Sequence, residues 1–135
     1  MNSKEVDPLK SSRLKLSMNV SVTGNAAILG LNGRICFKHE AALFSAIAQQ
    51  FLKIGKHVVI ELSAVEAIDN AGIGALVLLH MQAQAAGCEV RIVSPGKGVQ
   101  QVLELTNVAS LFESCSSVEA ALSSLPEKWS KLLVS

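Results

Sequence analysis

The stretch VVIELSAVEAIDNAGIGALVLLH, residues 58–80, decides the fold of this chain. Its first part is a run of β-branched residues, which is typical of a central strand covered on both faces, and we expect this strand over residues 57–62. Asp69 and Asn70 are both good helix N-caps, so they mark the start of a helix. The apolar residues that follow predict this helix over residues 71–86. The stretch therefore predicts a buried strand, a loop and a helix.

Upstream of this unit the pattern is that of strands. Residues 14–22 alternate between apolar and polar side chains, which predicts a half-buried strand. Thr23-Gly24-Asn25 predicts a hairpin turn, with the returning strand at residues 26–31. Asn32-Gly33 predicts a second turn, followed by a short extended segment at residues 34–36. A helix then precedes the central strand; its apolar stripe is Phe44, Ile47, Ala48 and Phe51, and Gly55 ends it.

Downstream, Gly87 ends the long helix and residues 88–93 predict another strand. Residues 98–106 have helical spacing, residues 111–113 suit a short strand, and Ser116 or Ser117 caps a last helix. Strands that alternate with helices predict an α/β fold. We expect one mixed sheet of four to five strands, with about four helices mainly on one side.

The domain organisation follows from where this pattern begins and ends. Residues 1–12 are polar and without periodicity, so they predict a flexible leader. The domain is expected over residues 13–125, and residues 126–135, which begin with Pro126 and contain Trp129, form a C-terminal tail. A chain of 135 residues suits one domain with its own core.

Composition excludes several classes of function. The chain has 12 basic and 11 acidic residues, a formal net charge of +1, which gives no electrostatic footprint for nucleic acid. The longest apolar run, residues 71–79, is about half of the ~20 residues that a membrane-spanning helix needs, so we expect no direct membrane insertion. Without a signal-like segment at the start, and with three separated cysteines that suit reduced thiols, the protein is expected in the cytoplasm. No metal or cofactor site is predicted.

The helix start after Asp69 is the candidate contact site. Free backbone N–H groups and the positive end of the helix dipole meet solvent there. Gly72 and Gly74 leave the first turn without side-chain bulk, so another surface can approach closely. A helix that is apolar nearly all round is either enclosed in a core or keeps one face for a partner. Complete enclosure is difficult in a domain this small, so we expect partner contact at its N-terminal half. We therefore expect Gly72→Arg or Ile73→Glu to fold normally but to lose partner binding.

The whole unit resembles the STAS domain of bacterial anti-sigma-factor antagonists. That family has a buried strand, a loop that ends in Asp, one or two hydroxyl residues, and then Gly, an aliphatic residue and Gly. The matching positions here are Asp69, Asn70, Ala71, Gly72, Ile73 and Gly74. LNGRIC at residues 31–36 and AGCEVRIVSPGKGVQQVLELTNVASLF at residues 86–112 resemble the family's flanking elements. The resemblance spans residues 14–124 and implies a single STAS-like domain.

The resemblance implies a non-enzymatic protein that binds an anti-sigma factor or a kinase-type regulatory protein. Contact is implied through residues 69–74, with Ser94 and Gly96 on the rim of the surface. In the family, phosphorylation of the hydroxyl at the helix start breaks the complex, because a dianion beside Asp repels and is costly to desolvate. Asn70 and Ala71 accept no phosphate, so no phosphorylation is expected at either position. Binding is then constitutive or regulated through the partner.

Two other functions stay open. AGIGALVLLH, residues 71–80, also resembles the cytoplasmic STAS subunit of lipid-transport ABC complexes, in which the same helix contacts an ATPase. A hydrolase or nucleotide-binding enzyme is the third interpretation. Cys36 with His39 suggests a thiol nucleophile and base, but three-residue spacing alone is weak evidence, and SPGKG at residues 94–98 lacks P-loop spacing. A triad of Asp69, His80 and Ser94 lacks the Gly-x-Ser-x-Gly elbow. The sequence leaves a homodimer open.

Overall fold

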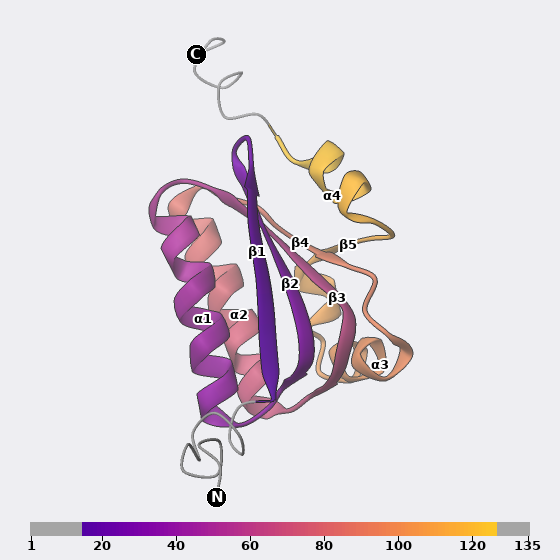
Figure 1. Ribbon diagram of the computed structural model, residues 1–135. Helices are drawn as coiled ribbons and strands as arrows, with labels where there is room; N and C mark the ends of the chain where they lie inside the picture. Colours follow the sequence, from indigo (N-terminus) through magenta and orange to yellow (C-terminus); the bar gives the residue numbers. More distant parts are fainter. Residues whose placement is uncertain (1–14, 127–135) are drawn as a thin grey trace, which may run out of the picture.

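The computed structural model describes residues 15–126, which form a five-stranded sheet flanked by helices (Figure 1). The strand order in space follows the chain, β1-β2-β3-β4-β5. β1 is antiparallel to β2 and the other neighbours are parallel, so the predicted mixed sheet is confirmed. The strands are β1 (Leu16–Thr23), β2 (Ala26–Ile35), β3 (His57–Ile68), β4 (Val90–Val93) and β5 (Glu113–Cys115). The helices are α1 (Phe37–Lys53), α2 (Asn70–Ala86), α3 (Lys97–Leu105) and α4 (Val118–Ser124), with a short 3-10 helix η3 (Ala109–Leu111). The leader expected at residues 1–12, and the expected tail beyond Pro126, lie outside the described residues.

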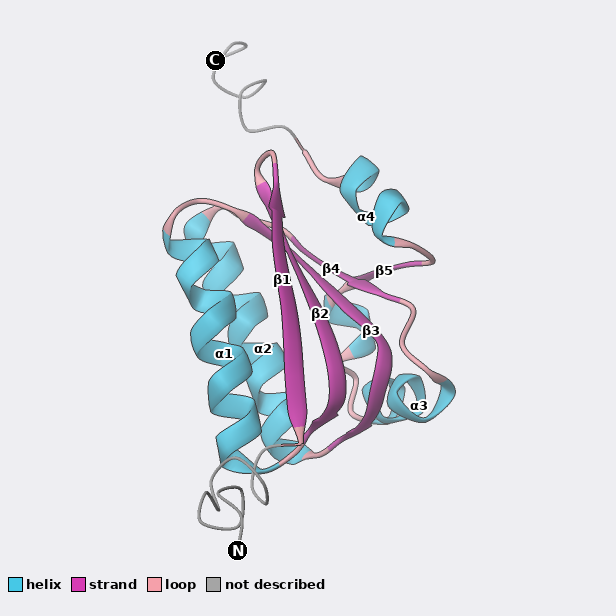
Figure 2. Cartoon of the chain, viewed as in Figure 1, coloured by secondary structure: helices cyan, strands magenta, loops and turns pink. Residues whose placement is uncertain are grey.

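The helices lie mainly on one side of the sheet, as the sequence predicts. α1, α2 and α3 share the main core, in which Phe44 and Leu103 pack with Ile60 of β3. α4 closes a smaller cluster on the other face, where Ala121 meets Val59. Figure 2 shows α1 and α2 together on one side and α4 on the opposite side.

β3 is the central strand that the β-branched run predicts. Val58 and Ile60 belong to the main core, whereas Val59 belongs to the smaller cluster on the other face. All three side chains are fully buried. A strand covered on both faces needs apolar residues at consecutive positions, and this requirement explains the run.

α2 is the long apolar helix that the sequence predicts, and it ends at Gly87, which has a left-handed backbone (φ +71°). Glycine adopts this conformation without steric cost, so it terminates the helix. Within residues 15–126, no helix combines the length and the apolar character needed to cross a bilayer.

The turn predicted at Asn32-Gly33 is wrong. β2 continues through these residues to Ile35, with an irregular register against β3 on either side of them. Gly33 has a φ of +109°, and a Cβ at this position would overlap the carbonyl oxygen of Lys15. Glycine is needed there because the backbone of β1 passes too close for any side chain.

Other strand boundaries also differ from the prediction. β4 begins at Val90 rather than at residue 88. β3 extends to Ile68 rather than ending at residue 62, because residues 64–68 pair again with β2 after the irregularity. β5 occupies Glu113–Cys115 rather than residues 111–113, because Ala109–Leu111 form η3. Ser117, one of the two caps predicted for the last helix, is its N-cap.

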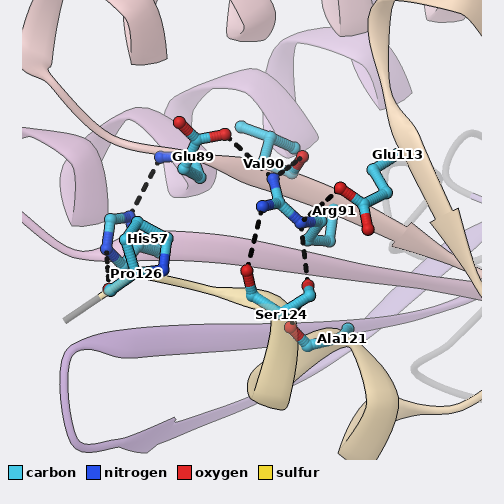
Figure 3. Close-up of polar contacts among 8 residues, drawn as sticks. All are labelled: His57, Glu89, Val90, Arg91, Glu113, Ala121, Ser124 and Pro126. Atoms are coloured by element: carbon cyan, nitrogen blue, oxygen red, sulfur yellow. Dashed lines mark hydrogen bonds and ion pairs between the residues drawn. The ribbon is translucent and has the colours of Figure 1, made fainter.

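Polar contacts fasten the end of α4 to the sheet (Figure 3). The buried guanidinium of Arg91 donates to the hydroxyl of Ser124 at 2.9 Å and to its carbonyl oxygen at 3.2 Å. Arg91 also forms an ion pair with Glu89 at 2.9 Å. The N–H of Glu89 donates to Nδ1 of His57 at 3.0 Å, so the neutral ring carries its proton on Nε2, which lies 3.1 Å from the carbonyl oxygen of Pro126.

The sheet topology brings three helix starts to one end of the molecule. α1 follows β2, α2 follows β3 and α3 follows β4, and these three strands are parallel neighbours. The carboxyl ends of parallel strands meet at one edge of the sheet, where ligand and partner sites of α/β folds commonly lie. The candidate site is therefore sought at this end.

Candidate functional site

Asp69 joins the starts of α1 and α2. Its Oδ1 accepts hydrogen bonds from the N–H groups of Ala71 and Gly72 at 3.0 and 3.1 Å, so the predicted N-cap is confirmed. Its Oδ2 accepts from the N–H of Phe37, the first residue of α1, at 3.0 Å. One carboxylate thus satisfies backbone donors of two helices. We name the surface around this junction the α1–α2 tip; its residues are Phe37, Asn70, Ala71 and Gly74.

The charge of Asp69 suits this position. Burial alone would raise its pKa, but the N–H donors of Phe37, Gly72 and Ala71 outweigh burial and lower the pKa below its ordinary value. The group is therefore ionised at neutral pH, beside the positive ends of two helix dipoles. Because backbone donors of both helices bind its two oxygens, Asp69 organises the tip.

Asn70 and Gly74 are exposed, and Ala71 is half-buried. A Cβ added at Gly74 would meet nothing within 4 Å, so the surface there is open. These positions are accessible to another protein, while their contact with a partner stays a prediction.

Gly72 and Ile73 face the interior instead. A Cβ on Gly72 would overlap the carbonyl oxygen of Ile35 and lie 2.6 Å from Cγ1 of Ile68. The surface that approaches Gly72 closely is therefore the chain's own β2, and Ile73 is part of the main core. The expectation that Gly72→Arg and Ile73→Glu would fold normally is wrong. The first substitution drives a side chain into backbone, and the second puts a charge into the core.

Ser94 and Gly96 follow β4 at the same end of the sheet. Gly96 is the exposed N-cap of α3. Ser94 has a left-handed backbone (φ +48°), and its N–H and hydroxyl donate to the carbonyl oxygens of Cys115 and Ser116 at 3.0 and 2.9 Å. These bonds tie Ser94 to the β5 edge of the sheet. The role of both residues on the rim of a contact surface stays a prediction.

Phe37 is a residue of the tip that the sequence analysis missed. Its side chain is 58% exposed, and the guanidinium of Arg34 lies 4.8 Å from its ring centroid. Its φ of +64° is strained for a bulky residue, and the bond from its N–H to Asp69 helps to hold it. The only signal in the sequence is an aromatic residue at the first helical position of a chain poor in aromatics.

An ion pair between the buried Glu40 and the half-buried Arg34 lies beneath the tip, and the sequence analysis missed it as well. Glu40 is fully buried and accepts from the N–H groups of Lys15 and Cys36, each at 2.8 Å. It also pairs with Nε of Arg34 at 3.0 Å. Burial alone would raise the pKa of Glu40, but these donors outweigh it and lower the pKa. The contacts join the start of β1, the end of β2 and the start of α1.

An apolar stripe leads away from the tip along α2. Leu78 and Met81 are exposed, and they follow Gly74 at a spacing that places all three on one face of the helix. α2 contains no Asp, Glu, Lys or Arg. α2, whose sequence is apolar nearly all round, therefore buries most of its surface and exposes the stripe of Gly74, Leu78 and Met81 to solvent.

The groups considered for catalysis do not form a catalytic arrangement. His39 is an exposed residue in the first turn of α1. Burial, followed by the carboxylates of Asp69 and Glu40, raises the pKa of the Cys36 thiol, which is the opposite of what a nucleophilic cysteine requires. His80 packs edge-on against the ring of Phe112, with centroids 5.7 Å apart. In the part of the chain that the structure describes, no group of three His, Cys, Asp or Glu is placed to hold a metal ion.

Comparison with known proteins finds relatives of this fold. The family model of the STAS domain matches residues 17–121. A crystal structure from Thermotoga maritima, assigned as an anti-sigma factor antagonist, is 25% identical with a TM-score of 0.68, covering 78% of this chain and 92% of that one. An anti-sigma factor antagonist from Mycobacterium paratuberculosis is 17% identical with a TM-score of 0.72, covering 83% and 95%. A murine anion transporter of solute carrier family 26 shares the fold at 15% identity and a TM-score of 0.68, covering 89% of this chain but 23% of that one.

Proposed function

Because the chain belongs to the STAS domain family, we propose that it is a non-enzymatic protein-binding module of the anti-sigma-factor antagonist kind. Its partner is an anti-sigma factor or a kinase-type regulator, and the complex forms in the cytoplasm. The observation that carries the proposal is the α1–α2 tip, where Phe37, Asn70 and Gly74 are exposed around a carboxylate that fixes two helix starts. The similarity to anti-sigma factor antagonists of known structure supports it.

The tip has the physical properties of a binding surface. Phe37 offers apolar area, and aromatic side chains are enriched among the residues that dominate binding energy. Asp69 holds the backbone of Phe37, and Glu40 holds the start of the helix that carries it. Binding of a partner at Phe37 would therefore cost little conformational entropy. Leu78 and Met81 extend the surface along α2.

The tip lacks the chemistry of a phosphorylation switch. A hydroxyl is the acceptor at the start of this helix in the family, and Asn70 and Ala71 provide none. The surface that meets the partner then keeps one charge state. We propose that the complex is constitutive or is regulated through the partner.

A pair of arginine variants tests the surface. Gly74→Arg places a long cation where a Cβ has open space, so it is expected to fold and to weaken partner binding strongly. Ala120→Arg adds the same charge on α4, on the opposite face of the sheet, and is expected to bind normally. The tagged protein is used to capture its partner from native lysate. The partner is identified by mass spectrometry, purified, and titrated against both variants by calorimetry.

Three outcomes would contradict the proposal. A folded Gly74→Arg protein with unchanged affinity would move the interface away from the tip. Capture of an ABC-transporter ATPase would favour the alternative, a STAS subunit of a lipid-transport complex. Stoichiometric phosphate on this chain after incubation with the partner and ATP, with loss of the complex, would exclude constitutive binding.

A further inference from the structure

Within residues 15–126, the outer edge of β1 is not paired with another strand. β1 is the first strand of the sheet and pairs with β2 alone among the described elements. Figure 1 shows β1 at the front of the molecule, with no helix or strand across its outer side. Backbone N–H and C=O groups at such an edge form a template for another strand. Natural edges are usually protected by charges, proline or bulges, and the sequence of β1, LSMNVSVT, contains no charged residue, proline or glycine.

The two faces of β1 differ in character. Leu16, Met18, Val20 and Val22 alternate with the polar residues Ser17, Asn19, Ser21 and Thr23. Among the described elements, α1 packs on β2 and β3, and the residues of β1 from Asn19 to Thr23 are exposed. Val20 is 44% exposed and Val22 is 51% exposed, although both point to the same side of the sheet as the main core. The apolar residues of β1 therefore extend the apolar face of the sheet, which α1 and α2 cover farther in, as far as the edge of the sheet.

We propose that two copies of this chain pair through β1, antiparallel and centred on Val20, to form a continuous ten-stranded sheet. In this register Val20 faces Val20 of the partner copy and Met18 faces Val22, so the apolar row meets an apolar row. On the other face Asn19 lies opposite Ser21 and Ser17 opposite Thr23, so polar groups meet polar groups. A shift of the register by one residue would pair the apolar side chains of one copy with the polar side chains of the other.

A second copy fits this edge for reasons of symmetry and charge. A two-fold interface must be complementary to itself, and residues 17–23 of β1 are complementary on both faces about Val20. No charged residue lies within β1, so self-pairing brings no like charges opposite one another. The formal net charge of +1 adds little repulsion between copies. The interface is small, so we expect weak association that depends on concentration.

The first test measures association directly. Sedimentation velocity of the wild-type chain up to millimolar concentration should show a monomer–dimer equilibrium. Val20→Lys places two cations opposite each other at the two-fold axis and should weaken the dimer by about tenfold or more. Leu105→Lys is the matched control, because it replaces another exposed apolar residue, on α3, and should leave the dimer unchanged. Thermal unfolding shows that each variant is folded.

The second test measures the register. Under a mild oxidant, the Val20→Cys variant should form a disulfide-linked dimer, since directly opposed strand residues meet the geometry of a disulfide. The Val22→Cys variant is the control, because its two new thiols would lie about 13 Å apart along the strands in this register. Peptide mapping separates these links from any formed by Cys36 or Cys115.

Any of the following outcomes would overturn the proposal. A wild-type chain that stays monomeric, or a dimer that Val20→Lys leaves intact, would exclude the β1 edge. Equal crosslinking of the two cysteine variants would exclude the register. Slow hydrogen exchange along the outer edge of β1 in a monomer would mean that residues 1–14 of the same chain occupy it. The proposal does not depend on the proposed function, because Val20→Lys leaves the α1–α2 tip untouched.

Discussion

Gly72→Ala and Gly74→Ala each add one methyl group to the first turns of α2, and we expect them to change stability in opposite directions. At Gly74 the new Cβ meets open space. The effect there is the ordinary gain of replacing glycine by alanine in a helix, about 0.5–1 kcal/mol. At Gly72 the new Cβ overlaps the carbonyl oxygen of Ile35 and crowds Ile68.

The size of the loss at Gly72 follows from what must move. Overpacking a tight site costs about 1–3 kcal/mol, and this site falls at the upper end because the obstacle is backbone. The same carbonyl oxygen accepts the N–H of Asp69 at 3.4 Å, so moving it also disturbs the cap. After subtraction of the helix gain, we expect a net loss of about 2 kcal/mol. The two variants then differ by about 3 kcal/mol, or about 10 °C in Tm for a domain of this size.

Urea unfolding followed by far-UV circular dichroism measures both values against the wild type. Equal slopes of the unfolding curves ensure that midpoint shifts report stability. A Gly72→Ala variant as stable as the wild type would refute the reasoning. It would mean that the end of β2 and the start of α2 separate at little cost, and that Gly72 is not required for their contact.

Two further predictions follow from the lowered and raised pKa values. The pKa values of Asp69 and Glu40 lie below their ordinary values of 3.8 and 4.5, so the two carboxylates stabilise the fold above those values, and this stability is lost as the pH falls through the folded pKa values. Asp69→Asn and Glu40→Gln should therefore flatten the fall of the urea midpoint below about pH 4. An unchanged slope would contradict the assigned contacts. The raised pKa of Cys36 should make its alkylation by iodoacetamide near neutral pH slower than that of a free cysteine, measured on its own peptide by mass spectrometry, and rapid labelling would count against the buried, acidic surroundings of the thiol.

Local signals in the sequence predicted much of the fold. The run in β3 reports burial on both faces, and Asp69 and Gly87 mark the ends of α2 through capping chemistry that depends on neighbouring residues alone. The end of β2 could not be predicted in the same way. Asn32-Gly33 is typical of a turn, but glycine is needed at position 33 because the carbonyl oxygen of Lys15, just before the neighbouring strand β1, lies too close for a side chain. A glycine that permits close approach looks the same in sequence as one that permits a turn.

The candidate site shows the same division. Its position at the start of α2 was predicted because the cap and the helix dipole are local features. Gly72 and Gly74 looked equivalent in sequence, yet one faces β2 and the other faces solvent. Phe37 and Glu40 were missed because their importance arises from contacts with Asp69 and with Arg34. Such contacts join segments whose proximity only the folded chain reveals.

Negative charge at the α1–α2 tip has different effects on folding and on the binding of a partner. Two helix dipoles end there, so the fold itself tolerates negative charge, and Asp69 already uses this property. A phosphate at the exposed position of Asn70 would therefore leave the domain folded and act on the partner alone. Asn70 and Ala71 provide no hydroxyl that could accept this phosphate. Under the proposed function, the complex would then be controlled by the partner or by the amount of free chain, and self-pairing through β1 would set the ratio of monomer to dimer without altering the tip.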